Sequence, residues 1–555
     1  MAYISPSGNI WLLSGVPLDK DYKNTLYWPL TSVGQTSQRT YFTTLKTQGG
    51  FVKHVFSNQS YTRRERGSIR VSVLADNVID CNYMVFQNSS FGPGKYFYAF
   101  ITSIEYINNA TTQINFEIDV IQTWYFDFTL MPCFIERMHT DSDEIGENIV
   151  PEPVHIGEYV YPSEIGRIIN TDDMVIIIAI VDTGINTAVT GNVYGRIYGA
   201  ATLKAFQPTD ISGINAELSS WVTAGKPDAV VAIYLAPAFL ITVSVPASGG
   251  LTLTSSNVRT IPDEQAMPRL TGTERFTGYL PHNKKMYTYP YNMYEVMTAS
   301  GASINLRYEF FNNLQPTFKV GGCITSPVEL ALIPYNYKNE VPQSATWFNT
   351  PIFSEAIKLT EFPVCSWSSD TYKAWLAQNS VPSLMNLGMA MLGAVGGAVI
   401  NPVMGGLGAL NVLREASSTL QQGFQASIAA DNMHGNLSGS SNIAMGYQGF
   451  YGGRKCINAS NAVCIDEFFD VFGYAIKSVM QPQRKNRKYF TYVKTTGCVL
   501  RELGSSYMGI PADDSEKICR LHDNGITYWD PAQTAANLIG DYSLGATNRP
   551  ISEES

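Results

Sequence analysis

The stretch from Ala374 to Leu413 contains no Asp, Glu, Lys, Arg or His, and no other part of the chain is comparable. Its centre, residues 385–400, is as apolar as a membrane span but unusually rich in Gly and Met. A bilayer core about 30 Å thick needs about 20 apolar residues in a helix, so the length is sufficient. The glycines weaken an isolated helix in water, whereas small residues favour close helix packing in lipid. Asn401-Pro402 predicts a bend between two apolar arms.

Two interpretations of this stretch are open, because Met-, Ala- and Gly-rich runs also occur as buried helices or packed interfaces of soluble proteins. A phosphate-binding loop at 406–411 is excluded, since the third glycine and the following acidic residue are missing. Residues 414–447 are rich in Ser, Gln, Asn and Ala and predict a return arm that is part helix, part flexible. Together the two parts predict a long loop that extends away from the rest of the protein and returns to it.

The length of 555 residues predicts more than one domain. Charged residues make up only 15 % and aromatic residues 12 %, which favours a β-rich protein with extensive interfaces. The formal net charge of −9 argues against a protein that clamps nucleic acid with basic faces. The first residues show no basic or apolar secretion signal, so we expect synthesis in the cytosol, with the apolar stretch sheltered until it is needed.

The opening third predicts antiparallel β-sheet. In residues 114–120 every second residue is apolar, which places Glu117 and Asp119 on the face toward water, and Asn108-Asn109 predicts the preceding hairpin turn. The predicted strands are Asn9–Leu13, Tyr41–Leu45, Ser68–Leu74, Tyr83–Phe86, Tyr96–Tyr106 and Gln113–Thr123.

The acidic, Pro-containing stretch Asp141–Glu158 predicts an exposed loop or linker at a domain boundary. Beyond it a small α/β insertion is expected, and from Leu280 an aromatic strand pattern resumes in a second β domain. The insertion is predicted from a strand at Met174–Val181, an amphipathic helix at Asp210–Val222 and a strand at Ala229–Leu235. Near the end we expect a helix at Ile465–Gly473 and a polar tail from Pro531. The basic turn at Gln483–Phe490 could touch a phosphate backbone, but a solvated turn or salt bridges between subunits are favoured.

We find no catalytic or metal-binding pattern in the sequence. No His has a metal-ligand spacing or a neighbouring nucleophile motif, although distant residues can still converge in a fold. Glu117 and Asp119 share a strand face, but the alternation explains them as the wet face. The expectation is a non-enzyme without a cofactor or metal. The eight cysteines lack paired spacing and predict reduced, mostly buried thiols, with a later disulfide left open.

Several blocks of sequence form a familiar series along the chain. They are Asp21–Thr25, Tyr96–Glu105, Phe116–Trp124, Phe468-Phe469 with Gly473-Tyr474, Arg487 through Tyr492-Val493, and Asp523–Thr527 with Trp529. These blocks resemble the tail-knob, or distal tail tube, proteins of small short-tailed bacteriophages that infect Gram-positive bacteria. Their order agrees along nearly the whole chain, and residues 141–279 depart most from the family pattern.

The resemblance implies a β-rich α+β, multidomain protein whose antiparallel β domains form a tube in a ring-shaped homohexamer at the tail tip. It further implies that phage DNA passes through the lumen without specific binding, that an upper tail tube or collar protein docks above, and that an apolar loop from each subunit plugs the tube and later penetrates the host membrane. The implied parts are a β tube domain (1–140), the insertion (141–279), a second β tube domain (280–373), the plug loop (374–447) and a C-terminal segment completing the tube domains (448–555).

The predicted membrane-active residues are the large apolar side chains of the plug. They are Leu384, Met385, Leu387, Met389, Met391, Leu392, Val395, Val399, Ile400, Val403, Met404, Leu407, Leu410 and Leu413. The competing hypotheses are a receptor-binding or adsorption protein of the tail, a cell-wall-degrading tail enzyme, and a pore-forming toxin, for which no secretion signal is visible. The expected location is the tail tip of the virion, after assembly in the host cytoplasm, with membrane contact during infection.

Overall fold

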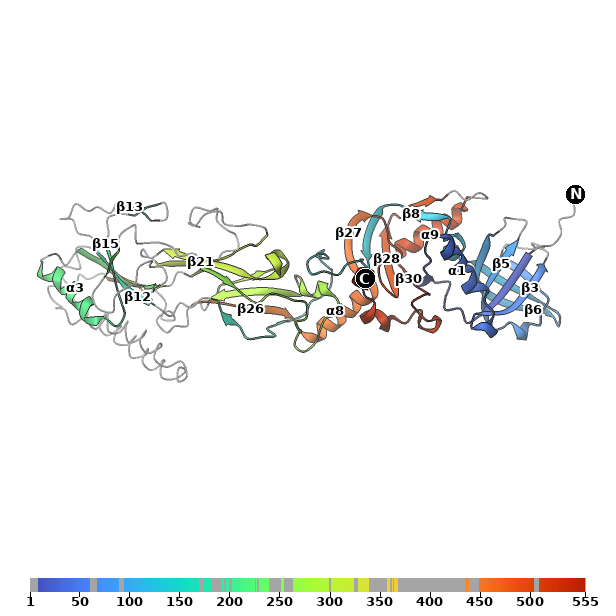
Figure 1. The fold of residues 1–555 in the computed structure, drawn as a ribbon, viewed down its shortest axis with the longest axis horizontal. Coiled ribbons are helices and arrows are strands. Elements are labelled where there is room, and N and C mark those ends of the chain that lie inside the picture. The colour runs from blue at the N-terminus through green and yellow to red at the C-terminus, as the bar shows by residue number, and fades with distance from the viewer. Residues whose placement is uncertain are drawn as a thin grey trace. The chain divides into compact units, whose positions relative to one another are not determined.

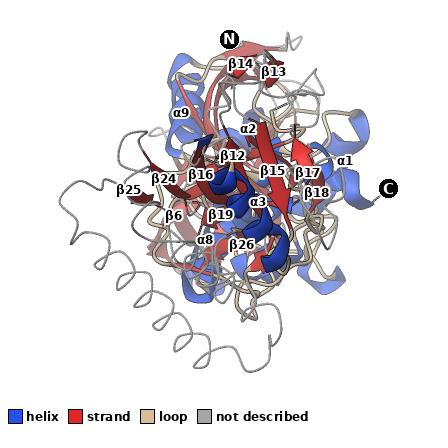
Figure 2. Ribbon diagram, turned by 90° about the vertical axis from the view of Figure 1, so that its left-hand side faces the viewer, coloured by secondary structure: helices blue, strands red, loops and turns tan. Residues whose placement is uncertain are grey.

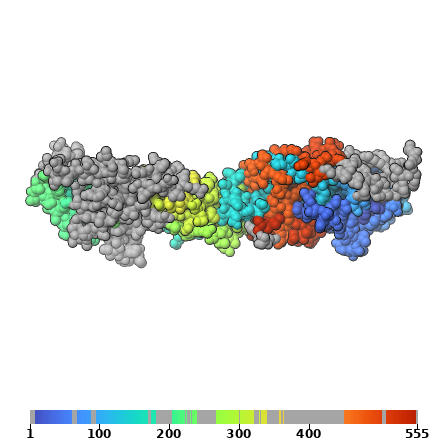
Figure 3. All heavy atoms as spheres, turned by 45° about the horizontal axis from the view of Figure 1, so that its top comes forward, coloured from blue at the N-terminus to red at the C-terminus, as the bar shows by residue number. Residues whose placement is uncertain are grey.

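A computed structural model of the chain shows two compact units, each built from separate parts of the sequence. Unit 1 contains residues 1–157, 278–286 and 459–555, and unit 2 contains residues 158–277 and 287–458. Both chain ends therefore belong to unit 1, where the blue N-terminal and red C-terminal segments lie side by side (Figures 1 and 3). The structure describes residues 8–59, 67–88, 94–168, 174–180, 191–193, 196–198, 202–224, 226, 229–238, 251–253, 263–298, 301–323, 328–338, 357–359, 362, 364–367, 435–438, 449–503 and 509–554.

The first sheet of unit 1 has six antiparallel strands in the order β3-β1-β5-β6-β7-β4. Tyr83 and Val85 pack into one hydrophobic cluster and Met84 and Phe86 into another, because successive side chains of a strand point to opposite faces. The sheet is therefore buried on both faces along β5. Its strands are β1 (Gly8–Ser14), β3 (Val52–Gln59), β4 (Ser68–Val71), β5 (Cys81–Asn88), β6 (Tyr96–Asn108) and β7 (Thr111–Ile118).

The hairpin turn predicted at Asn108-Asn109 is confirmed, since it joins β6 to β7. The strand predicted at Tyr41–Leu45 is wrong: this stretch ends helix α1 (Ser32–Thr43). The Thr31 side chain caps the helix by accepting the Gly34 N–H, and residues 34, 38 and 42 form its buried face at a spacing of four. Helix α2 (Val120–Trp124) follows β7 directly.

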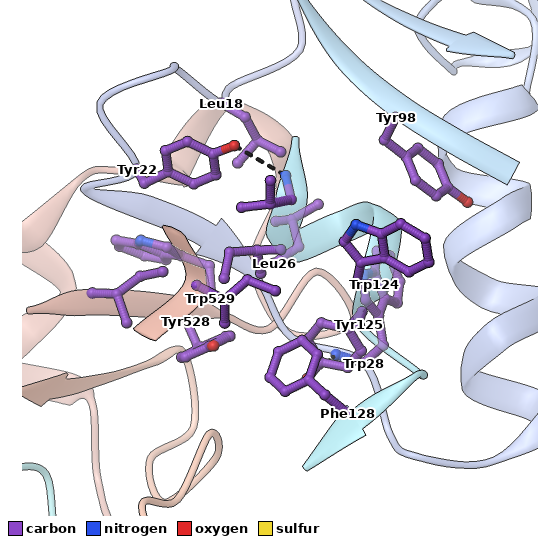
Figure 4. Close-up of a cluster of buried hydrophobic side chains, with 14 of the residues drawn as sticks. Leu18, Tyr22, Leu26, Trp28, Tyr98, Trp124, Tyr125, Phe128, Tyr528 and Trp529 are labelled. Carbon is purple, nitrogen blue, oxygen red and sulfur yellow. Dashed lines mark hydrogen bonds between the residues drawn. The ribbon is translucent and has the colours of Figure 1, made fainter. Parts of the chain in front are cut away.

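The second sheet of unit 1 combines strands from both ends of the chain in the order β2-β30-β28-β9-β27, and β8 pairs separately with β29. Its core joins Leu26 and Trp28 from the N-terminal part, Tyr125 after α2, and Tyr528 and Trp529 from the C-terminal part (Figure 4). The elements are β2 (Asn24–Leu26), β8 (Phe128–Leu130), β9 (Cys133–Met138), α8 (Ala459–Phe472), β27 (Tyr474–Met480), β28 (Phe490–Thr496), β29 (Leu500–Glu502), α9 (Ala512–Asn524) and β30 (Ile526–Trp529).

Unit 2 is built from antiparallel sheets with one α-helix, α3 (Ile211–Thr223), among its described residues. One sheet has the order β10-β26-β19-β20 with β11 beside β26, another β18-β21-β22-β23, and a third β17-β15-β12-β16-β24-β25. The strands are β10 (Tyr159–Val160), β11 (Gly166–Arg167), β12 (Met174–Ile180), β13 (Gly191–Val193), β14 (Arg196–Tyr198), β15 (Thr202–Phe206), β16 (Val230–Pro237), β17 (Leu251–Leu253), β18 (Asp263–Ala266), β19 (Asn292–Thr298), β20 (Ser303–Leu306), β21 (Thr317–Cys323), β22 (Glu329–Pro334), β23 (Ile357–Leu359), β24 (Val364–Trp367), β25 (Gly435–Ser438) and β26 (Phe450–Ile457).

The predicted strand, helix and strand of the 141–279 region are confirmed as β12, α3 and β16. Figures 1 and 2 show α3 beside the strands of this sheet, and the Lys204 ammonium of β15 lies 2.5 Å from the Glu217 carboxylate of α3. β12 pairs antiparallel with both β15 and β16. The predicted β-rich, antiparallel, multidomain fold is confirmed, whereas the five-part division of the chain stays a prediction.

Candidate functional site

The predicted membrane-active residues from Leu384 to Leu413 lie outside the described residues, but the strands on either side of them are described. β24 pairs antiparallel with β25, with Trp367 opposite Gly435 and Val364 opposite Ser438. β24 therefore ends, and β25 begins, at the same end of one strand pair. This pairing agrees with the expected loop, and it shows that the return arm includes a strand.

The strand pair is part of a larger sheet whose inner strands are buried. β24 pairs on its other side with β16, where Ala232 lies opposite Ser366. The next strand, β12, is buried at every residue from Met174 to Ile180, as its continuous aliphatic sequence requires for a strand covered on both faces. Ile214 of α3 is also buried. β24 and β25 thus belong to a sheet whose inner strand β12 is fully buried.

Among the residues that the structure describes, no helix is long and apolar enough to cross a membrane. The apolar stretch itself is outside that set.

A second feature is a cluster of buried charged and polar side chains in unit 1, around Asp466 of α8, whose side chain is fully buried. Its carboxylate accepts hydrogen bonds from the Tyr279 hydroxyl (2.7 Å) and from the backbone N–H groups of His282 (2.5 Å) and Asn283 (3.1 Å). The Asn283 amide also bonds Asp470 (2.7 Å), which lies 3.0 Å from the His282 ring. Burial raises the pKa of Asp466, although the hydrogen bonds oppose that shift.

Asp143 extends this cluster. Its side chain accepts a short hydrogen bond from the Tyr474 hydroxyl and another, at 3.0 Å, from the Lys284 N–H. The same hydroxyl lies 3.1 Å from Asn283 Oδ1. Burial raises the pKa of Tyr474 well above its ordinary value, and the Asp143 charge adds to this shift, so the hydroxyl stays a hydrogen-bond donor.

Glu152 forms the centre of a neighbouring buried ion-pair network, and its side chain is fully buried. It pairs with Arg137 and, at 2.7 Å, with Lys285, and it accepts the Ala475 N–H at 2.7 Å. Burial lowers the pKa of Lys285, whereas the Glu152 charge raises it. A buried charge without its partner is strongly destabilising, so the members of this network depend on one another.

These networks fasten the short segment 278–286 within unit 1. The chain passes between the units after residues 157, 277, 286 and 458, and the charged residues lie on stretches that end or begin at these points. The prediction that Asp141–Glu158 is an exposed linker is therefore wrong for Asp143 and Glu152, although the boundary at its end is present. The partners on residues 278–286 and on α8 lie too far away in the sequence for these contacts to be predicted from it.

The basic turn at Gln483–Phe490 is not a solvated turn, because Arg484 and Arg487 are buried. The Arg484 guanidinium lies 4.4 Å from the centre of the Phe128 ring and 4.8 Å from that of Tyr125, and donates to both backbone carbonyls. Asn548 accepts the N–H groups of Tyr489 and Phe490, so part of the predicted polar tail packs on β28. This stretch is part of the core of unit 1 rather than a nucleic-acid contact.

Asp119 also differs from its prediction, since it is 1 % exposed rather than on the wet face. The strand β7 ends at Ile118, and Asp119 caps α2 by accepting the Gln122 N–H at 3.0 Å. Its other oxygen accepts the Tyr83 hydroxyl at 2.8 Å. Burial raises the pKa of Asp119 to about 6. Glu117, in contrast, is exposed as predicted.

Clusters of ionisable side chains and grooves are the places among the described residues where catalysis could occur. They contain no group of three or more His, Cys, Asp or Glu side chains able to hold a metal ion. One groove of about 580 Å³ in unit 1 is lined by hydroxyl, aromatic and apolar residues, without an acid or base that could activate a serine. Its lining residues are Trp28, Ser32, Val33, Thr36, Ser37, Thr40, Tyr41, Pro531 and Ala532.

The expected burial of thiols is confirmed for most of the cysteines whose side-chain exposure the structure describes. Cys81, Cys133, Cys456 and Cys498 are buried, Cys519 is half-buried, and Cys464 is exposed. Cys133, Cys498 and Cys519 lie near one another in the fold, and no spacing in the sequence predicts this.

Comparison with known families gives two matches that together cover most of the chain. Residues 257–546 match the C-terminal domain of tail knob protein gp9 of Bacillus phage phi29. Residues 6–129 match the N-terminus of the caudoviral major tail protein.

Full-length relatives agree with these matches. The chain is 26 % identical to tail knob protein gp9 of Bacillus phage phi29 over 619 residues, which covers 98 % of this chain and 99 % of the relative. It is 25 % identical to tail knob protein gp9 of Bacillus phage PZA, with the same coverage. The solved tail knob protein gp12 of bacteriophage C1 has a similar fold, with a TM-score of 0.58 at 12 % identity over 98 % of this chain and all of that one.

Proposed function

Because the chain belongs to the family of phage tail knob proteins typified by gp9 of phi29, we propose that it forms the distal tail tube through which phage DNA is ejected. It is a structural tail protein of the virion. The proposed subunit arrangement is a ring-shaped homohexamer whose antiparallel β domains build the tube, with an α/β insertion from residues 141–279. An upper tail tube or collar protein docks above the ring.

The apolar segment plugs the tube and, on release, penetrates the host membrane. The observation that supports this proposal is the pairing of β24 with β25, in which Trp367 lies opposite Gly435. A loop attached in this way can change its surroundings while its base stays folded. Its forty residues without an ionisable side chain, Ala374 to Leu413, suit a lipid environment.

Confinement in a ring gives this segment a physical reason to stay inside until ejection. Exposed apolar surface costs about 25 cal/mol per Å² in water, so copies packed against one another in a lumen are sheltered together. Transfer into lipid gives the same apolar surface a second favourable environment. The proposed site residues are those from Leu384 to Leu413 named above.

The negative net charge of the chain supports a conduit rather than a DNA-binding surface. Carboxylates on a lumen wall repel phosphates and limit adhesion, the reverse of binding through released counterions. In this proposal the protein assembles in the host cytoplasm, resides at the tail tip and contacts the host membrane during infection, and DNA passes without specific binding.

Electron microscopy of the purified full-length protein tests this proposal. Six-fold tubes with density across one end, open when residues 384–413 are deleted, are the expected result. Monomers or trimers without a channel would contradict it and favour an adsorption protein. Tubes that remain closed after the deletion would contradict the plug alone, because the ring would then be sealed by another part of the chain.

A further inference from the structure

Three cysteines that are far apart in the sequence meet in unit 1. Cys133 begins β9, Cys498 follows β28, and Cys519 lies in α9. Cys498 is 8 % exposed and belongs to the main hydrophobic cluster, and Cys519 packs against that cluster while remaining partly exposed. β9 and β28 are adjacent strands, which brings Cys133 to the same region.

The backbone around Cys498 is fixed against the face of α9 that carries Cys519. Asp523 lies four residues after Cys519, so the two side chains share one helix face. The Asp523 carboxylate accepts the Cys498 N–H at 3.1 Å and the Thr495 hydroxyl at 2.7 Å. Within this arrangement the Cys498 side chain lies near enough to those of Cys519 and Cys133 for the three thiols to influence one another's pKa.

The surroundings of these thiols favour their protonated form. Burial raises the pKa of Cys133, Cys498 and Cys519, and the Asp523 charge adds to the shift at each. Thiolate is the species that reacts with disulfides, so the cluster reacts slowly at neutral pH. Cys519 is the most exposed of the three and is the point at which a reagent can enter.

We infer that Cys498 and Cys519 form an intramolecular disulfide when the protein passes from a reducing to an oxidising environment. The oxidant is a low-molecular-weight disulfide. The Cys519 thiolate attacks one of its sulfur atoms, which forms a mixed disulfide and releases one small thiol. The Cys498 thiolate then attacks the Cys519 sulfur and releases the second small thiol. The two protein thiols lose two protons and two electrons, and the oxidant gains them as two thiols.

This disulfide would tie α9 to the end of β28. It closes a loop of about 20 residues that contains β29, and such a link restricts the unfolded chain. The inference depends on the thiol positions in unit 1 and stands whether or not the apolar segment acts on membranes.

Peptide mapping of the full-length protein tests the inference. The protein is incubated with oxidised glutathione or with dithiothreitol, alkylated, and digested with trypsin without reduction. Cleavage after Lys494 and Arg501 and after Lys517 and Arg520 places Cys498 and Cys519 on separate peptides. We expect these peptides to be joined only in the oxidised sample, with a melting temperature higher by on the order of 5–10 °C.

Matched variants make the result specific. Cys519→Ser should lose both the linked peptides and the rise in melting temperature, whereas Cys464→Ser, at an exposed cysteine of α8, should keep both. Unlinked peptides after oxidation would overturn the inference. So would a link from Cys133 to Cys498, or a mixed disulfide that persists on Cys519, because each shows that Cys498 does not reach Cys519.

Discussion

Trp367 and Gly435 lie directly opposite each other at the end of the β24–β25 strand pair, although the whole apolar segment separates them in the sequence. Opposite residues of an antiparallel pair have Cα atoms about 5 Å apart, so a tight hairpin can join them. The geometry of this strand pair is therefore compatible with a short connection between the two residues.

This relationship predicts that residues 368–434 can be replaced by a short Gly- and Asn-containing turn. The variant should remain folded and assemble as the full-length protein does, while losing release of dye from lipid vesicles. Circular dichroism, light scattering and the vesicle assay check these outcomes. A second variant with a Gly/Ser segment of the original length separates loop length from apolar character. An unfolded turn variant would show that the segment is needed for the fold.

Val395→Asp should leave assembly intact and lower DNA delivery into cells. A charge at the middle of a bilayer costs several kcal/mol, so the segment would insert poorly. Phage assembled with the variant, counted by electron microscopy and assayed for ejected DNA, gives both readouts. Ser417→Asp introduces the same charge beyond the apolar run and serves as the control. Normal delivery with Val395→Asp would refute membrane insertion at this position.

Asp466→Ala should destabilise unit 1 strongly. It removes the acceptor for several buried donors on residues 279–283, which would cost on the order of 3–5 kcal/mol. Glu467→Ala, at the exposed next position of α8, should change stability by no more than about 0.5 kcal/mol. Denaturant unfolding of both variants measures the difference. Equal effects would mean that the Asp466 network contributes little.

Asp119 predicts a pH-dependent difference between wild type and Asp119→Asn. Burial raises its pKa to about 6 in the folded protein, so the folded state binds more protons than the unfolded state between about pH 4 and 6. The stability contributed by Asp119 therefore falls as pH rises through this window. The melting temperature of Asp119→Asn relative to wild type should rise from pH 4 to pH 7. A constant difference in melting temperature between Asp119→Asn and wild type across this pH range would contradict the prediction.

His139 should make the stability of the protein depend on pH in the opposite direction. Burial lowers its pKa to about 3, and Arg487 adds to the shift, so the neutral ring accepts the Tyr492 N–H at 2.8 Å. Between about pH 3 and 6.5 the unfolded state binds more protons, and the stability from His139 is lost as pH falls. His139→Gln should thus destabilise the protein at pH 7 and lose less on acidification than wild type. His155→Gln, at an exposed position, is the control, and parallel acid titrations of His139→Gln and wild type would contradict the assignment.

Local pattern was sufficient where strand neighbours are close in sequence. The hairpin of β6 and β7 follows from alternation and from Asn108-Asn109, and β12, α3 and β16 follow from their periodicity. The pattern misled at Tyr41, where aromatic residues suggested a strand. Gly34, Gln38 and Phe42 follow a Thr N-cap at a spacing of four, and this pattern indicates a helix rather than a strand.

Contacts between distant segments could not be predicted from the local pattern of the sequence. Arg484 packs on Tyr125 and Phe128, and Asp143 bonds Tyr474, so residues that look like a wet turn and a linker are buried. A charged residue is buried only when a partner meets it, and the sequence does not say which partner will.

The sequence by itself determined the β-rich class, the apolar segment as the unusual part of the chain, and the family resemblance, because each depends on composition or on residues close together. Only the tertiary structure decided that 278–286 belongs with both chain ends, that Trp367 pairs with Gly435, and that Cys498 and Cys519 belong to one cluster. The reason is that distant segments must satisfy one another's hydrogen bonds and cover one another's apolar surface. Which segments do so determines the strand pairing and the burial of polar groups.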